Sequence, residues 1–267
     1  MKKNRHSRII EIMETKNTIS IKELALRLDC TEMTIRRNLD ELQEMNFVKR
    51  EHGFVTLLNP AQPTDYYKQI GENIQEKIAI ASIALSYVHP DQTICIDSGT
   101  TTQQLAIMLP DDIRLSVITS SLVAAMALSG KENIQVLLPS GFLNHKNRSV
   151  NLVDSDSLRQ YEADVAFISC RSFRLPGGAY EHSQSLTATK KAIASIARKR
   201  ILLLDYTKWG LTSLCNSIKL DQINLIITDN RTPKEYIKKT VELGKEIIIV
   251  NPEGNSIENH YNPTDFV

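Results

Sequence analysis

The chain has 267 residues, of which 42% are hydrophobic, and a formal net charge of +1. This length suits two compact domains, and the apolar content is sufficient for buried cores, which excludes a disordered chain. The sequence contains no apolar run of the ~18 residues that a membrane helix needs. Its charged start also lacks the apolar segment of a signal peptide. We therefore expect a cytoplasmic protein with no membrane partner.

Neither the charge nor the cysteines indicate a particular partner. Residues 1–58 contain 11 Lys+Arg and 9 Asp+Glu, a net charge of +2, and the remainder carries −1. DNA binding would therefore depend on a few placed arginines rather than on bulk charge. The histidines have no metal-ligand spacing, and no metal or other cofactor is expected. The cysteines are dispersed, without a C-x-x-C pair, which argues against a zinc site. They are Cys30, Cys95, Cys170 and Cys215, and Cys95 and Cys170 lie in apolar strand-like runs that predict buried, reduced thiols.

The first sixty residues show the element order of a winged helix-turn-helix. An apolar face predicts a helix over residues 5–16. Ser20 and Glu23 match a capping box in front of the amphipathic stretch 21–28. After a further helix, two short apolar segments, Phe47-Val48 and residues 55–58, predict a hairpin.

The helix after Thr31, its expected N-cap, has two different faces. Ile35, Leu39 and Leu42 form one apolar stripe, while polar side chains cover the other side. A recognition helix needs this division, because its apolar side docks on the preceding helix and its polar side enters the major groove. The alternative interpretation of the Arg-Arg pair is a solvated helix face. The residues expected to contact DNA are Ser20, Thr31, Met33, Thr34, Arg36, Arg37, Asn38, Glu41, Arg50 and His52.

Residues 59–72 interrupt the periodicity with two prolines and are predicted to link a winged helix-turn-helix domain (1–58) to a larger domain (73–267). A helix is expected at 72–88, and strands and helices then alternate. This alternation predicts an α/β domain with an open, mostly parallel sheet that binds its ligand at the carboxyl ends of the strands. Strands are expected at 94–97, 115–119, 135–140, 165–170, 200–206, 224–229 and 246–251, and helices at 102–109, 121–128, 185–199 and 233–243.

Two loops after strands combine hydroxyl groups with a helix start. Residues 97–102 (DSGTTT) follow one strand, and residues 119–121 (TSS) follow the next. Free backbone N–H groups, hydroxyls and the positive end of a helix dipole would meet there, which suits a phosphate. Ordinary N-capping is the alternative for each loop.

The N-terminal motifs resemble those of the DeoR family of bacterial transcriptional regulators. The family's recognition helix has the pattern Thr, hydrophobic, Arg, Arg, Asp, Leu, and its wing has Arg-x-His-Gly-Gly. Residues 34–39 and 50–54 match these patterns except at Asn38 and Phe54. Residues 73–250 are similar to the family's sensor domain, which is related to ribose-5-phosphate isomerase and binds phosphorylated sugars or their derivatives.

The resemblance also assigns an effector site, with some departures from the family. Ser140-Gly141 replaces Gly-Gly, Ser169 and Ser172 replace frequent glycines, and Leu186 replaces a glutamate four residues before the motif lysine. Replacing that carboxylate would change which hydroxyls the pocket can hold. The residues assigned to the effector are Asp97, Ser98, Gly99, Thr100, Thr101, Thr119, Ser120, Ser121, Gly141, Lys190, Asp205 and Lys208.

Together these features predict a homo-oligomeric regulator, not an enzyme, that binds double-stranded operator DNA. The expected form is a repressor of carbohydrate genes controlled by a phosphorylated sugar or a related small anion. The rival hypothesis is a sugar-phosphate isomerase-like enzyme with an N-terminal interaction module. Isomerisation needs a general base, commonly a carboxylate, and Leu186 stands at the usual glutamate position. A structural DNA-binding protein without an effector is the third reading.

Overall fold

The computed structural model describes residues 5–16, 18–44, 48–57, 69–211 and 213–262. The chain divides into two compact units, residues 1–74 and 75–267. Each unit is described by itself. No helix in the described part of the chain is long and apolar enough to span a membrane.

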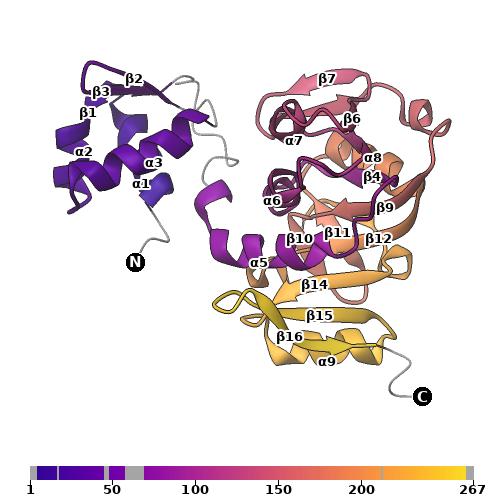
Figure 1. Ribbon diagram of the computed structural model, residues 1–267. Helices are drawn as coiled ribbons and strands as arrows, with labels where there is room; N and C mark the ends of the chain where they lie inside the picture. The colour runs from indigo at the N-terminus through magenta and orange to yellow at the C-terminus, as the bar shows by residue number, and fades with distance from the viewer. Residues whose placement is uncertain (1–4, 17, 45–47, 58–68, 212, 263–267) are drawn as a thin grey trace. The chain divides into compact units, whose positions relative to one another are not determined.

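The first unit is a winged helix-turn-helix (Figure 1). Its described residues up to 57 form three helices and a three-stranded antiparallel sheet with the order β1-β3-β2. The helices and strands of this unit are α1 (Arg5–Thr15), β1 (Thr18–Ser20), α2 (Ile21–Arg27), α3 (Glu32–Glu44), β2 (Val48–Glu51) and β3 (Phe54–Leu57).

The predicted apolar faces form one core in this unit. Ile9 and Met13 of α1 are fully buried, as are the α3 residues Ile35, Leu39 and Leu42. The hairpin is also confirmed, although Phe47 and Leu58 of its predicted strands lie outside the described residues. Strand β1 is missing from the sequence prediction, because three residues are too few to show a period-two pattern.

The second unit is built on an eight-stranded sheet with the order β16-β15-β14-β12-β9-β4-β5-β6. All neighbouring strands are parallel except the edge pair β15–β16. The strands are β4 (Thr93–Ile96), β5 (Leu115–Thr119), β6 (Ile134–Leu137), β9 (Ala163–Ile168), β12 (Ala197–Leu203), β14 (Leu225–Asp229), β15 (Glu246–Asn251) and β16 (Ser256–Tyr261).

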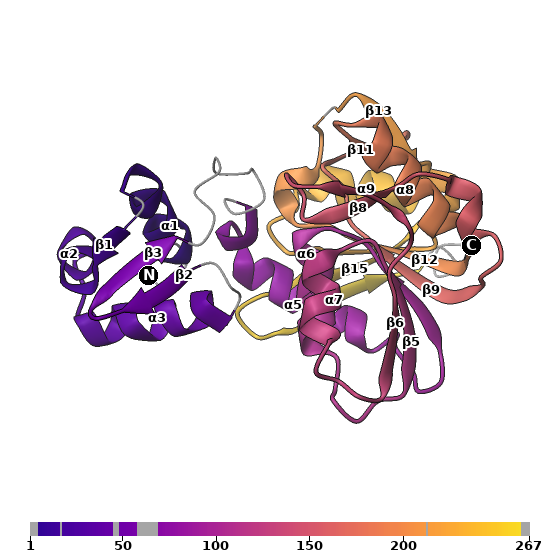
Figure 2. The same cartoon turned by 90° about the horizontal axis from the view of Figure 1, so that it is seen from above.

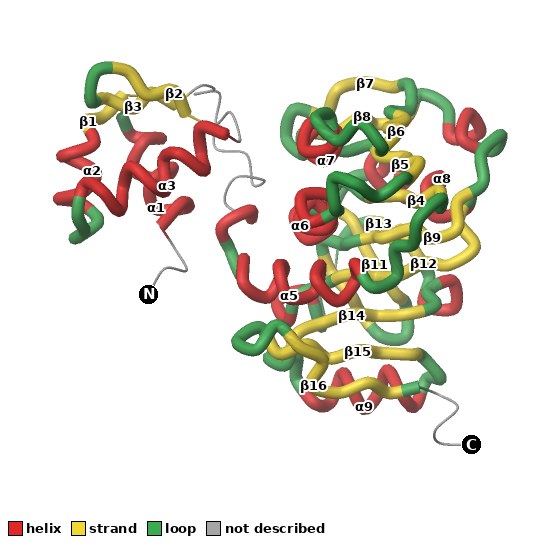
Figure 3. Tube along the Cα trace, in the orientation of Figure 1, coloured by secondary structure: helices red, strands yellow, loops and turns green. Residues whose placement is uncertain are grey.

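Helices cover both faces of this sheet, because its strands are apolar on both sides. One core packs the first three helices onto the sheet, and α6 and α7 lie side by side (Figure 2). The other core packs the last two, and α9 lies beside β15 (Figure 3). The helices are α5 (Ile74–Leu85), α6 (Thr100–Met108), α7 (Leu122–Leu128), α8 (Gln184–Ser195) and α9 (Lys234–Glu242).

Two small antiparallel sheets absent from the sequence prediction are attached to this domain. One is the hairpin β7 (Gly141–Asn144) and β8 (Ser149–Leu152). The other has the order β10-β11-β13 and consists of β10 (Ser172–Arg174), β11 (Gly178–Glu181) and β13 (Cys215–Ile218). Their strands of three or four residues are too short for a clear alternation of polar and apolar side chains.

Several predicted ends lie a few residues from the observed ones, and the largest shift is at the end of α8. The helix expected at 185–199 ends at Ser195, and β12 begins at Ala197. Residues 197–199 pair with β9 in parallel register instead. The sequence Ala-Arg-Lys is compatible with a helix, and sheet pairing overrides that local preference.

Candidate functional site

The recognition helix α3 begins at the predicted cap. Thr31 Oγ1 accepts a hydrogen bond from Thr34 N–H at 3.2 Å. At the start of α2, Ser20 Oγ likewise accepts from Glu23 N–H at 3.1 Å. Both predicted caps are therefore confirmed. They satisfy N–H groups that have no partner within the helix.

Four of the predicted DNA contacts are exposed on α3, namely Met33, Arg36, Arg37 and Glu41. Met33 is 80% exposed, and Arg37 is also exposed. Arg36 is exposed, and its Nη2 lies 3.7 Å from Oε2 of Glu32, one helical turn earlier. Asn38 is half-buried, and its Nδ2 donates to Thr34 O at 2.6 Å, so this amide is held against the helix backbone. Arg36 and Arg37 are thus exposed cations of this helix, and Arg36 forms an ion pair with Glu32.

Two other predicted DNA contacts are bonded within the domain. Arg50 of β2 ion-pairs with Asp40 and donates from Nε to Gln43 Oε1 at 3.1 Å, which ties the wing to α3. Glu41 Oε2 lies 3.2 Å from His6 Nε2 on α1. Arg50 and Glu41 therefore position the reading elements in this structure.

The tip of the wing is formed by a tight turn. His52 and Gly53 have positive φ angles of 49° and 83°. Phe54, at the family's second glycine position, begins β3 and needs no such angle. The Phe54 side chain is exposed beside His52, so the wing offers an aromatic ring and an imidazole.

At the carboxyl edge of the large sheet, Lys190 of α8 forms a buried ionic cluster. Its ammonium group ion-pairs with Asp97, donates to Ser169 O at 2.7 Å, and lies 3.1 Å from Glu181 Oε1. All three charged side chains are at most 3% exposed. Burial alone would lower the pKa of Lys190, but Asp97 and Glu181 outweigh burial and raise it, so the amine stays charged.

Ser169 connects this cluster to the loop after β4. Its N–H and Oγ–H both donate to Asp97 Oδ2 at 3.1 Å. The serine also packs against Gly99, where an added Cβ would lie 1.7 Å from Ser169 Oγ. Glycine is therefore required at position 99 by close approach, since its φ of −88° is ordinary. Ser169, which stands where the family often has a glycine, is therefore part of the site.

The loop after β4 presents a helix N-terminus, as predicted. Thr102 Oγ1 accepts from Gly99 N–H at 3.1 Å and donates to Asp97 O at 2.7 Å, which closes the loop. The first N–H groups of α6 have no acceptor within the helix. This geometry leaves backbone donors and the Thr100 and Thr101 hydroxyls available to an anion.

The second predicted loop uses two of its three hydroxyls for local structure. Thr119 Oγ1 donates to Ile96 O at 2.6 Å, and Ser121 Oγ caps α7 by accepting from Ala124 N–H at 3.1 Å. Helix capping therefore explains Ser121, and a hydrogen bond to the backbone of β4 explains Thr119. Ser120 Oγ differs, because it is buried without a hydrogen-bond partner among the described residues.

Strand β8 covers this edge of the sheet. Val150 N–H donates to Ser120 O at 2.8 Å, and Leu152 N–H donates to Thr189 Oγ1 of α8 at 3.1 Å. Within the described residues, Ser149 Oγ and Asp97 Oδ1 resemble Ser120 Oγ in being buried without a partner. Buried polar atoms without partners are costly. The two serine hydroxyls therefore suit hydroxyl or phosphate oxygens of a ligand, whereas Asp97 Oδ1, an acceptor, suits a ligand hydroxyl.

Two further predicted effector residues approach this cluster from β12. Burial raises the pKa of the Cys170 thiol to about 12, and the charges of Glu181, Lys190, Lys208 and Asp205 all act on it. Asp205 is fully buried and caps the turn that carries Lys208. Asp205 and Lys208 thus share with Lys190 and Glu181 an electrostatic effect on Cys170.

Trp209 and Gly141 have packing roles. Trp209 stacks on Tyr236 with ring centroids 5.7 Å apart and donates to Thr228 Oγ1 at 3.2 Å, so it is buried in the core. A Cβ added at Gly141 would lie 2.1 Å from Asn151 O across the hairpin, which makes this glycine a requirement of β7–β8 pairing.

Glu181 is the residue that sequence reasoning missed. Leu186, at the family's glutamate position, is buried in α8. The carboxylate beside Lys190 comes instead from β11, nine residues before the lysine. A single acidic residue at the end of an unrecognised three-stranded sheet gives no local signal, so only the tertiary structure could reveal it.

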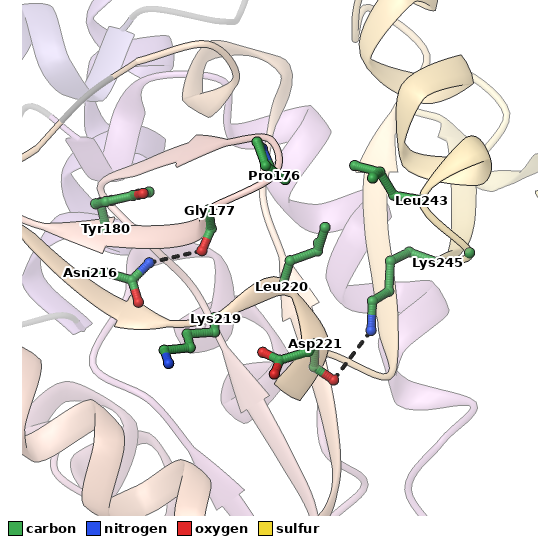
Figure 4. A pocket seen from close by; sticks show the side chains of 10 residues that line it. Pro176, Gly177, Tyr180, Asn216, Lys219, Leu220, Asp221, Leu243 and Lys245 are labelled. Carbon is green, nitrogen blue, oxygen red and sulfur yellow. Dashed lines mark hydrogen bonds between the residues drawn. The ribbon is translucent and has the colours of Figure 1, made fainter.

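A hollow of about 770 Å³ lies elsewhere in the domain (Figure 4). Its lining includes Lys245, which precedes β15, and Asp221, which precedes β14, so it is at the amino ends of these parallel strands. Lys245 Nζ donates to the carbonyls of Asp221 and Ile223 at 3.2 and 3.1 Å. Asn216 Nδ2 donates to Gly177 O at 2.9 Å. These polar side chains donate hydrogen bonds to backbone carbonyls, and none of the predicted effector residues lines the hollow.

Two family models match the chain. The DeoR-like helix-turn-helix domain covers residues 5–61, and the DeoR C-terminal sensor domain covers residues 72–230. The chain belongs to the DeoR family. The two domains and the motifs in each of them are those of a DeoR-family transcriptional regulator. The family predicted from the sequence is therefore confirmed.

Two relatives that are transcriptional regulators agree with this assignment, and one solved structure is also similar. The HTH-type transcriptional regulator GolR of Listeria innocua is 33% identical over 92% of this chain and 97% of its own length. The glycerol-3-phosphate regulon repressor of Escherichia coli is 27% identical over 86% of this chain and 91% of its own length. Ribose 5-phosphate isomerase A of Methanocaldococcus jannaschii aligns with a TM-score of 0.40 at 17% identity, covering 52% of this chain and 55% of that chain.

Proposed function

We propose that this DeoR-family regulator is a cytoplasmic repressor of carbohydrate-metabolism genes whose operator binding is controlled by a phosphorylated sugar or a related small anion. The observation that carries the proposal is the Lys190 cluster, which stands beside a helix N-terminus in a chain that also holds a recognition helix. The name of the glycerol-3-phosphate regulon repressor supports a phosphorylated carbohydrate as effector.

In this proposal α3 reads the major groove. Arg36 and Arg37 are its solvent-facing arginines, and their planar guanidinium groups suit guanine edges or phosphates. The wing approaches the backbone with His52, while Arg50 holds the wing on α3. A homo-oligomer would present two such helices to repeated half-sites, as operators for small reading heads require.

The effector would lie at the carboxyl edge of the sheet. Its phosphate would accept hydrogen bonds from the loop of Ser98 to Thr101 and from the first turn of α6. Its hydroxyls would pair with the buried atoms Asp97 Oδ1, Ser120 Oγ and Ser149 Oγ. To act as an inducer, the effector must bind the DNA-free state more tightly than the DNA-bound state.

The test is a fluorescence-anisotropy titration of the full chain onto DNA from its own upstream region, beside scrambled DNA at fixed salt. We expect Arg37→Ala to weaken specific binding about tenfold and non-specific binding much less. Arg198→Ala is the matched control, since it removes one exposed arginine from the sensor domain. Wild-type binding should also weaken when phosphorylated sugars are added.

Three outcomes would count against the proposal. Absence of DNA binding at low salt would overturn the regulator function. Equal loss of affinity in Arg37→Ala and the Arg198→Ala control would overturn the assignment of the reading face. Turnover of pentose phosphates by the purified protein would favour the isomerase hypothesis.

A further inference from the structure

The charge balance around Lys190 limits which effectors this site accepts. An ammonium group has three N–H donors. Three oxygens already surround it within 3.1 Å, namely Asp97 Oδ2, Ser169 O and Glu181 Oε1. These oxygens are enough to occupy the donors, so Lys190 is not a free cation for a phosphate.

The cluster as a whole is negative. It holds two carboxylates and one ammonium, and the ion pair of Lys190 with Asp97 is the closer of its two. The second carboxylate is Glu181, which is 3% exposed. Its Oε2 lies 3.9 Å from His182 Nδ1, and this histidine offsets the negative charge only when it is protonated. Arg171 donates its backbone N–H to Glu181 Oε1 at 3.1 Å, while its side chain is exposed. Asp205 and Lys208, whose charges also act on Cys170, add one negative and one positive charge.

The two ends of the site therefore differ in the ligand chemistry they favour. The loop before α6 offers N–H and hydroxyl donors and the positive end of a helix, which suit an anion. The Glu181 side offers a negative charge in a low-dielectric interior, where charges act strongly and over a longer range than in water. The buried acceptor Asp97 Oδ1 has no donor among the described residues, so it requires a donor from the ligand.

We propose that Glu181 is a specificity-determining residue, which restricts the effector to a sugar or polyol with one phosphate and an uncharged, hydroxyl-bearing opposite end. A ligand with a second anionic group, such as a phosphorylated sugar acid, would bring its carboxylate toward Glu181 and be rejected by like-charge repulsion. This inference rests on the proposed phosphosugar effector. It goes beyond that proposal because it names the class of phosphosugar that binds.

The experiment uses matched pairs of ligands that differ only in the end opposite the phosphate. Alditol phosphates of four, five and six carbons are compared with the corresponding aldonate phosphates by calorimetric titration into the full chain. We expect the wild-type protein to bind the preferred alditol phosphate at least about tenfold more tightly than its aldonate partner. In Glu181→Gln that ratio should fall to about threefold or less.

Two further variants separate charge from structure. Glu181→Asp retains the charge and should retain the wild-type preference. Glu162→Gln removes an exposed carboxylate next to the amino end of β9 and should leave the ratio unchanged. The circular dichroism spectrum of Glu181→Gln shows whether this variant folds. If it does not fold, the ratio of alditol phosphate to aldonate phosphate affinity in the wild-type protein still tests the proposal.

The possible failures are distinguishable. If the wild-type protein binds aldonate phosphates as tightly as alditol phosphates, the inference is overturned and the proposed function stands. If Glu181→Gln and Glu162→Gln change the ratio equally, the role of Glu181 is likewise overturned. If no ligand of either series binds, the phosphosugar effector itself fails, and this inference fails with it.

Discussion

At the scale of single residues, this site depends on close contacts between groups that are distant in sequence. Lys190, Asp97 and Glu181 come from a helix, a loop and a separate small sheet, and they share one buried position. Removing the lysine would leave two buried carboxylates without a cation, which is far more costly than losing an exposed ion pair. The geometry of Ser169 and Gly99 is constrained in the same way.

Gly99→Ala tests this constraint. The new methyl group would lie 1.7 Å from Ser169 Oγ and 2.7 Å from Ser169 Cβ. Rotating the serine would relieve only the first contact and would break its hydrogen bond to Asp97. We expect the free energy of unfolding to fall by about 1–3 kcal/mol in urea titrations, as for other overpacked sites.

The double variant Gly99→Ala/Ser169→Gly should recover part of that loss, because the clashing side chain is gone. Gly130→Ala is the matched control, since nothing lies within 4 Å of its added Cβ. A Gly99→Ala protein as stable as the control would contradict the close approach seen here.

Asp229 gives a pH-dependent prediction. Burial raises its pKa from 3.8 to about 6, against the lowering effect of hydrogen bonds from Tyr206 and Arg231 N–H. Because the folded pKa exceeds the unfolded one, the folded protein binds the proton more tightly. Ionised Asp229 therefore destabilises the fold above about pH 6. This cost disappears as the pH falls from about 6 to 4.

The difference in unfolding free energy between wild type and Asp229→Asn isolates this effect. It should shift in favour of the wild-type protein by about 2 kcal/mol between pH 7 and pH 4. Other titrating groups contribute equally to both proteins and cancel. A difference that stays constant with pH would show that Asp229 titrates normally.

At the scale of elements, the polar side chains at helix starts decide which hydroxyls remain for ligands. Ser20, Thr31 and Ser121 all cap helices, and Thr119 bonds the backbone of β4. Capping and ligand binding compete for the same residue types, so the sequence pattern alone leaves both open. In this protein, capping accounts for three of these hydroxyls and a strand carbonyl for Thr119, and Ser120 remains.

The cap of the recognition helix is testable in the full chain. Thr31→Ala removes the acceptor for Thr34 N–H and should destabilise α3 by about 1 kcal/mol. The affinity for specific DNA should also decrease, because the side chains proposed to read DNA follow Thr31 directly in α3. Thr31→Ser keeps the hydroxyl and should behave like wild type, both in thermal unfolding and in anisotropy titrations. Equal loss in both variants would indicate a role other than capping.

At the scale of the whole molecule, the helix after the predicted linker is tied to the ligand edge of the sensor sheet. Glu76 in the first turn of α5 is buried, and its Oε1 lies 3.1 Å from Arg231, which follows β14. Arg231 also lies over the Tyr206 ring, with Cζ 3.9 Å from the centroid. The start of α5 is thus connected to the carboxyl ends of β12 and β14.

Arg231→Ala should weaken communication rather than binding. We expect effector affinity within about threefold of wild type, but a smaller change in DNA affinity on adding effector, since coupling is a free energy separate from either affinity. Arg231→Lys, which can keep the ion pair, is the comparison. Anisotropy titrations with and without effector measure both quantities. Full coupling in Arg231→Ala would exclude this connection.

Much of the molecule follows from local patterns in the sequence. Apolar spacing predicts the helices and the parallel strands, because each must bury one stripe or both faces. Ser20 and Thr31 identify two helix starts, and the recognition-helix and sensor motifs indicate the family. Even the loop at Asp97 is found, because strand, glycine and helix follow one another directly in the chain.

Other features were decided only by the tertiary structure. The end of α8 moves to Ser195 because the next residues gain more from pairing with β9 than from another helical turn. Ser169 and Glu181 meet Lys190 from 21 and 9 residues away in the chain, Ser169 with its backbone carbonyl and Glu181 with its carboxylate. Whether a hydroxyl caps a helix or awaits a ligand depends on the same packing. Local sequence determines the elements, whereas the charge and shape of the site arise where elements distant in sequence meet.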